Sequence, residues 1–102
     1  MSKYVWQDAW VLLAVKYAQG ESDGASRSEV FKACDFINHS ALLDDELAHA
    51  IEVFSKSDLM HADGDIFRLG PAFASLWSDS QAEKHRSVHI QLEKLQNALG
   101  VS

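Results

Sequence analysis

The chain has 102 residues and a net charge of −6, with 47% hydrophobic and 24% charged residues, a composition typical of one soluble globular domain. Its single cysteine, Cys34, excludes an internal disulfide, and the apolar run that contains Val11 to Val15 is far shorter than the roughly 20 residues of a membrane-spanning helix. No basic segment precedes a long apolar core as in a secretory signal, so we expect a cytoplasmic location.

The first predicted helix covers Val5 to Ala18 and is apolar on two sides. One side carries Trp6, Ala9, Trp10, Leu13 and Tyr17 at helical spacing, and the nearly opposite side carries Val11, Leu12 and Val15. A helix that is apolar on two sides is usually packed between two neighbours. The second neighbour is either the C-terminal helix or another subunit.

Capping patterns mark the next two helices. Ser26-Arg27-Ser28-Glu29 is a capping box, which predicts that the second helix begins here. A turn follows from Asn38 to Leu42, and Asp44 is the expected N-cap of a third helix that ends near Ser57. Acidic residues in its first turn suit the positive end of the helix dipole.

A β-hairpin is predicted after the third helix. Its strands are Leu59 to Ala62 and Asp65 to Leu69, and Asp63-Gly64 between them is typical of a type I′ turn, in which both central residues have positive φ. Phe67 and Leu69 should point inward, with Ile66 and Arg68 outward. Gly70-Pro71 then ends the strand and starts a helix.

The rest of the chain is predicted to be helical to about Leu99, with Gly100 ending the helix. A second capping-box pattern, Ser80 to Glu83, either breaks this helix near Ser78 to Ser80 or lies within a continuous one. Apolar residues in its last turns have the four-three-four spacing of a coiled-coil seam. We therefore expect a homodimer whose interface combines this seam with the second face of the first helix: Val11, Leu12, Val15, Val88, Leu92, Leu95 and Leu99.

Three segments carry a resemblance to a known family: Leu47 to Phe54, Asp58-Leu59-Met60, and Asp63 to Pro71. They resemble the third helix, the leucine that follows its end, and the wing of the winged helix-turn-helix superfamily. Asp58 stands where many relatives have a glycine in the left-handed conformation. The resemblance implies an α+β, mostly helical fold with a two-stranded wing and a long C-terminal helix. Residues 1–80 would form the winged-helix part, and residues 81–102 a dimerisation helix of the same domain.

The resemblance also implies where a partner would bind: exposed positions of the third helix and the wing, namely Asp45, His49, Glu52, Lys56 and Arg68. Yet the segment from Asp44 to Asp65 contains seven acidic residues against one lysine, a balance of −6 that equals the net charge of the whole chain. Nucleic acid binding relies on Lys and Arg near phosphates, so this charge disfavours DNA. We expect a non-enzymatic regulatory module that binds a protein partner; the alternative is a DNA-binding transcription regulator.

The remaining residue patterns give little support for a metal site or a catalytic site. His85, His89 and Glu93 are four residues apart and could share a helix face, but a hydrated surface explains them better than a metal site. Cys34 lies on the apolar face of the second helix and is expected to be a buried small residue. No phosphate-binding glycine loop, nucleophile motif or zinc spacing is present, so no cofactor, metal or catalytic residue is predicted.

Overall fold

The computed structural model describes residues 4–101, which form an α+β fold that is mostly helical. The elements are α1 (Trp6–Gln19), β1 (Ala25–Ser26), α2 (Arg27–Asn38), α3 (Asp44–Ser57), β2 (Met60–Asp63), β3 (Ile66–Leu69), α4 (Phe73–Ser80), a 3₁₀ turn η1 (Ala82–Lys84) and α5 (Val88–Leu99). The three strands form one antiparallel sheet in the order β1-β3-β2.

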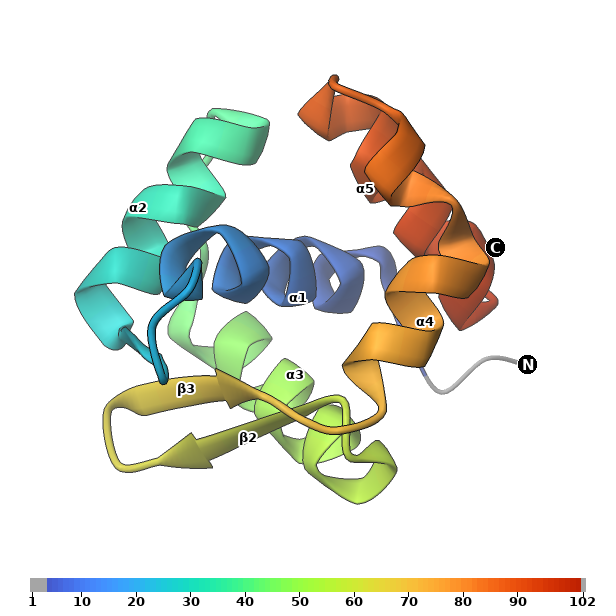
Figure 1. The fold of residues 1–102 in the computed structure, drawn as a ribbon. Coiled ribbons are helices and arrows are strands. Elements are labelled where there is room, and N and C mark those ends of the chain that lie inside the picture. Colours follow the sequence, from blue (N-terminus) through green and yellow to red (C-terminus); the bar gives the residue numbers. More distant parts are fainter. Residues whose placement is uncertain (1–3, 102) are drawn as a thin grey trace.

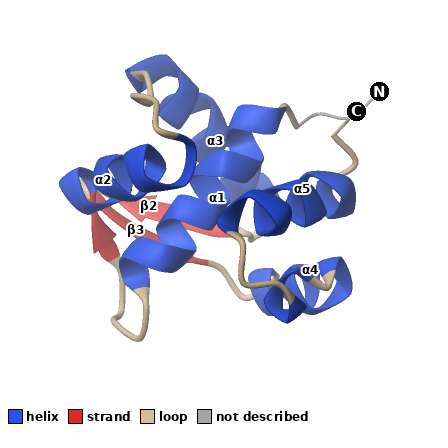
Figure 2. Ribbon diagram, turned by 90° about the horizontal axis from the view of Figure 1, so that it is seen from above, coloured by secondary structure: helices blue, strands red, loops and turns tan. Residues whose placement is uncertain are grey.

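Helix α1 lies in the middle of the molecule, between α2 on one side and α5 on the other (Figures 1 and 2). It contacts α2, α3, α5 and β3, and eight consecutive residues from Asp8 to Val15 are buried. The second neighbour of its two apolar faces is therefore the C-terminal helix of the same chain. Trp10 also joins α1 to α2, because its indole N–H donates to the Cys34 carbonyl at 2.9 Å.

The residues predicted to form a dimer interface lie in this core. Six of them are buried within one chain and the seventh, Val88, is partly buried against them: Val11, Leu12, Val15, Leu92, Leu95, Leu99 and Val88. These side chains are not available to a second subunit in this structure. The homodimer itself stays a prediction. These seven residues do not form its interface, because they pack within one chain.

At the start of both α2 and α3, a glutamate side chain accepts a hydrogen bond from a free backbone N–H group. Glu29 accepts from the Ser26 N–H at 2.9 Å while the Ser26 hydroxyl accepts from the Glu29 N–H at 3.2 Å, so the predicted capping box is confirmed. The bond from the Ser26 N–H, and secondarily the nearby Ser26 hydroxyl, lower the pKa of the Glu29 carboxyl. The predicted N-cap of α3 is wrong by one residue. It is Leu43 rather than Asp44, because the Glu46 carboxylate accepts from the Leu43 N–H at 3.0 Å and supplies the cap.

Asp58 ends α3 in the left-handed conformation, at φ 58°, as expected for the position that a glycine often takes. The chain then passes close to itself, since a Cβ on Gly70 would lie 2.0 Å from the Asp58 carbonyl oxygen. Glycine at position 70 is required by this approach. The contact fixes the end of the hairpin, just after β3, against the end of α3.

The hairpin is present, with two corrections. Asp63 pairs with Ile66, so the turn residues are Gly64 and Asp65, one later than predicted. Positive φ occurs at Gly64 and not at Asp65, which excludes type I′. As expected, Phe67 is buried while Ile66 and Arg68 are exposed.

The sheet has three strands rather than the predicted two. β1 pairs Ala25 with Phe67 and Ser26 with Ile66. Two residues show no alternation of polar and apolar side chains, so periodicity could not predict this strand. Its signal is Gly24, where a Cβ would lie 2.8 Å from the Ile66 side chain, so only glycine lets the loop approach β3 this closely.

The long C-terminal helix is divided. Gln81 has a φ of 65°, which ends α4, and η1 and an extended segment separate it from α5. Of the two alternatives that the sequence left open, the structure has the broken helix, with the break at residues 81–87 rather than near Ser78 to Ser80. Residues 81–102 do not form one dimerisation helix, because α5 packs on α1 and α4 in the common core.

Candidate functional site

The exposed face of α3 and the hairpin carries all five side chains that were predicted to meet a partner. Asp45, His49, Glu52 and Lys56 follow one another along α3 at steps of four, three and four, and Arg68 points outward from β3. All five are exposed. We name the surface formed by these five residues the α3–hairpin face.

The two basic residues of this face are held by carboxylates. Lys56 lies 3.6 Å from Glu52, and Arg68 lies 3.8 Å from Asp63. Exposed pairs of this kind contribute about 0–1 kcal/mol to stability, but they do partly neutralise each cation. Asp45 and Asp65, by contrast, have no ion-pair partner among the described residues. These five residues carry two acidic and two basic side chains, and the excess of negative charge comes from Asp63 and Asp65 of the hairpin, which bring the acidic side chains to four against two.

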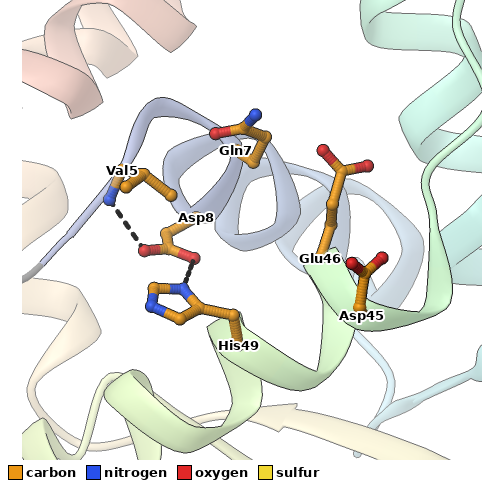
Figure 3. Close-up of a pocket in the computed structure, with 6 residues that line it drawn as sticks. All are labelled: Val5, Gln7, Asp8, Asp45, Glu46 and His49. Atoms are coloured by element: carbon orange, nitrogen blue, oxygen red, sulfur yellow. Dashed lines mark hydrogen bonds and ion pairs between the residues drawn. The ribbon is translucent and has the colours of Figure 1, made fainter.

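A pocket of about 340 Å³ opens where the start of α1 meets α3 (Figure 3). It is lined by residues from the first turn of α1 and the first half of α3: Val5, Gln7, Asp8, Asp45, Glu46 and His49. Three of the six are acidic and none is lysine or arginine. The pocket joins two of the predicted partner-binding residues, Asp45 and His49, and leaves Glu52, Lys56 and Arg68 outside its lining.

The central feature of the pocket is the pair formed by Asp8 and His49. The Asp8 side chain is completely buried, whereas that of His49 is 43% exposed. The Asp8 Oδ1 lies 2.8 Å from the His49 Nδ1, and its Oδ2 accepts from the Val5 N–H at 2.9 Å. A buried carboxylate is costly unless both oxygens have partners, and here one partner comes from each of two helices. The pair thus ties α1 to α3.

Sequence reasoning missed Asp8 as a site residue. It gave no weight to a charged residue at the edge of an otherwise apolar stretch in the first helix. A charge in such a place is itself a signal, because a buried carboxylate must find partners elsewhere in the fold. Its partner, 41 positions away, could not be chosen from among the five histidines by spacing.

The pocket offers hydrogen-bond acceptors more than reactive groups. Its lining includes no serine, threonine, cysteine or lysine that could act as a nucleophile. Cys34 lies in the core, where burial, and secondarily the negative charge of Glu46, raises the pKa of its thiol from 9.0 to about 12. Such a thiol stays protonated and unreactive at neutral pH. The arrangement is suited to binding a group that donates hydrogen bonds.

Among residues 4–101, no three or more His, Cys, Asp and Glu side chains are grouped so that they could hold a metal ion. The helix face expected for His85, His89 and Glu93 does not form, because α5 begins at Val88 and His85 precedes it in extended conformation. No described helix is both long and apolar enough to cross a membrane.

Comparison of the chain with models of known protein families, with curated proteins and with solved structures finds no match in any of the three.

Proposed function

We propose that this chain is a winged-helix domain that serves as a non-enzymatic docking module for a basic segment of a partner protein. The order α1, β1, α2, α3, β2, β3 and the sheet order β1-β3-β2 support the fold assignment. In this proposal α3 is the helix that other winged-helix domains present to DNA, and the β2–β3 hairpin is the wing. Since a fold alone is a weak warrant for function, the choice of partner rests on the surface.

The observation that carries the proposal is the charge on the α3–hairpin face. Its two cations are engaged with Glu52 and Asp63, while Asp45 on α3 and Asp65 in the hairpin turn have no ion-pair partner among the described residues. DNA carries a dense row of phosphates, and affinity for it comes largely from free Lys and Arg side chains that displace counterions. This face would repel a duplex. The same negative charge attracts a peptide segment that is rich in lysine or arginine.

The experiment that tests the proposal is a pair of titrations at low salt, where electrostatic attraction is greatest. The protein is added to a fluorescently labelled DNA duplex and, separately, to a labelled arginine-rich peptide, and anisotropy is followed. We expect the peptide to bind, with an affinity that falls as salt is added, and the duplex to show no binding. Binding of the duplex that weakens steeply with salt would instead support a DNA-binding transcription regulator.

A further inference from the structure

The two ring nitrogens of His49 have different roles. Nδ1 lies 2.8 Å from the Asp8 Oδ1, and Asp8 is fully buried. A carboxylate can only accept hydrogen bonds, so Nδ1 must carry the hydrogen. In a neutral ring the other nitrogen, Nε2, then has a free lone pair. Asp8 thus acts as a positioning residue that turns His49 into a hydrogen-bond acceptor on the exposed side of the ring.

The other polar groups of the pocket are also mostly acceptors. Asp45 has no hydrogen bond or ion pair with any described residue, and Glu46 uses one oxygen to accept from the Leu43 N–H at 3.0 Å. Both residues precede His49 by about one turn of α3, and Gln7 lies opposite on α1, whereas the His49 ring points toward Asp8 (Figure 3). Gln7 supplies the one side-chain donor of the lining besides the His49 Nδ1–H, which Asp8 already binds. Acceptors therefore outnumber donors in the pocket, which favours a group that donates hydrogen bonds.

We propose that this pocket binds the guanidinium group of an arginine in the partner protein, an inference that rests on the proposed docking function. Ammonium and guanidinium are the charged side-chain groups that donate and never accept. Guanidinium has five N–H donors in one plane, so it can bind both oxygens of a carboxylate at once, whereas an ammonium is a point charge. A pocket of about 340 Å³ has room for such a planar group.

The rim of the pocket suits the rest of an arginine and its neighbours. Val5 is 46% exposed in the lining itself, and Leu43, which caps α3 next to Glu46, is 59% exposed. Arginine carries an apolar stem below its charged head, and this stem packs on apolar surface. The occupant is therefore an arginine flanked by apolar residues in the partner chain. Within the lining itself, the exposed Val5 side chain supplies the apolar surface next to the carboxylates.

The experiment uses nitrogen NMR of the histidine rings in the full chain at pH 8, where histidine side chains are generally neutral. The free protein is expected to show His49 with its hydrogen on Nδ1. The probe is a short peptide with one arginine between leucines, and its control has citrulline, which keeps the shape without the charge. We expect the arginine peptide to shift the His49 Nε2 resonance and the citrulline peptide to leave it unchanged.

Two variants test the same point by affinity. Asp45→Asn removes one pocket carboxylate, and Asp23→Asn removes the same charge from the exposed loop before β1. We expect about tenfold weaker binding of the arginine peptide for Asp45→Asn and a change of less than about twofold for Asp23→Asn, a tenfold change being about 1.4 kcal/mol. The amide spectrum of each variant verifies that it is folded.

The possible failures are distinguishable. If the peptide shifts amides of the α3–hairpin face but leaves the His49 ring unchanged, or if His49 carries its hydrogen on Nε2, the arginine pocket is wrong while the docking function stands. If neither the single-arginine peptide nor an arginine-rich peptide binds anywhere, both proposals are wrong.

Discussion

At the scale of single residues, the buried Asp8 is the least expected feature of the chain. Its carboxylate has a backbone partner at the start of α1 and a side-chain partner on α3. Removal of one partner from a buried polar group costs more than the bond itself contributes, because the remaining group stays desolvated. The pair therefore has a structural effect as well as its proposed role in setting the His49 acceptor.

We expect His49→Ala to lower the free energy of unfolding by about 1–3 kcal/mol, because Asp8 then keeps only the Val5 N–H as a partner. Asp8→Ala should lower the free energy of unfolding less in the His49→Ala variant than in the parent protein. The difference between the two values, which is the coupling energy of the pair, should be about 0.5–3 kcal/mol. Urea denaturation of the two single variants and the double variant measures this cycle.

The matched comparison is the exposed pair Glu52 and Lys56 on the same helix. Its coupling should not exceed about 0.5 kcal/mol, the usual value for helix surface pairs four residues apart. If the two cycles give equal couplings, Asp8 is not held by His49 in the way the structure indicates.

At the scale of elements, the sequence predicted most helix positions because their signals are local. The Ser26–Glu29 box, the left-handed Asp58 and the closing Gly100 each involve a few neighbouring residues, and all three are confirmed. Features that depend on distant contacts were missed or misplaced. Strand β1 depends on the close approach of Gly24 to β3. The break that begins at Gln81 was indicated in the sequence only by the capping-box pattern from Ser80 to Glu83.

Asp58 offers a test at this scale, because an L-residue in the left-handed region is strained and glycine is not. Replacing Asp58 by glycine should raise the free energy of unfolding by up to about 1 kcal/mol, since the strain is about 1–2 kcal/mol for most residues and smaller for Asp. Loss of the exposed Asp58–His61 pair, at 3.2 Å, offsets part of the gain.

Asp58→Ala is the control, because it loses the same carboxylate and keeps the strain. In thermal or urea denaturation, the free energy of unfolding of the glycine variant should exceed that of the alanine variant by about 1 kcal/mol. An alanine variant as stable as the glycine variant would show that backbone conformation does not limit stability at this helix end.

At the scale of the whole molecule, a central helix and an uneven distribution of charge define the protein. The apolar second face of α1, which suggested a subunit interface, is covered by α5 of the same chain. The acidic excess of residues 44–65 was visible in the sequence, but the pocket that Asp45 and Glu46 share with Asp8 and His49 required the folded chain. Composition can count charges; only the fold decides which of them share a surface and which cations are already paired.

The most direct test of the docking claim compares one labelled arginine-rich peptide on two variants of equal net charge. Asp45→Asn with Glu52→Gln neutralises two exposed carboxylates of the α3–hairpin face, and Glu21→Gln with Asp23→Asn neutralises two in the loop after α1. At about 150 mM salt, where charges further apart than about 8 Å are screened, we expect the first variant to bind about tenfold more weakly than the parent and the second to change less than about twofold. Equal weakening of both variants would mean that the peptide responds to total charge, and would contradict a docking site on this face.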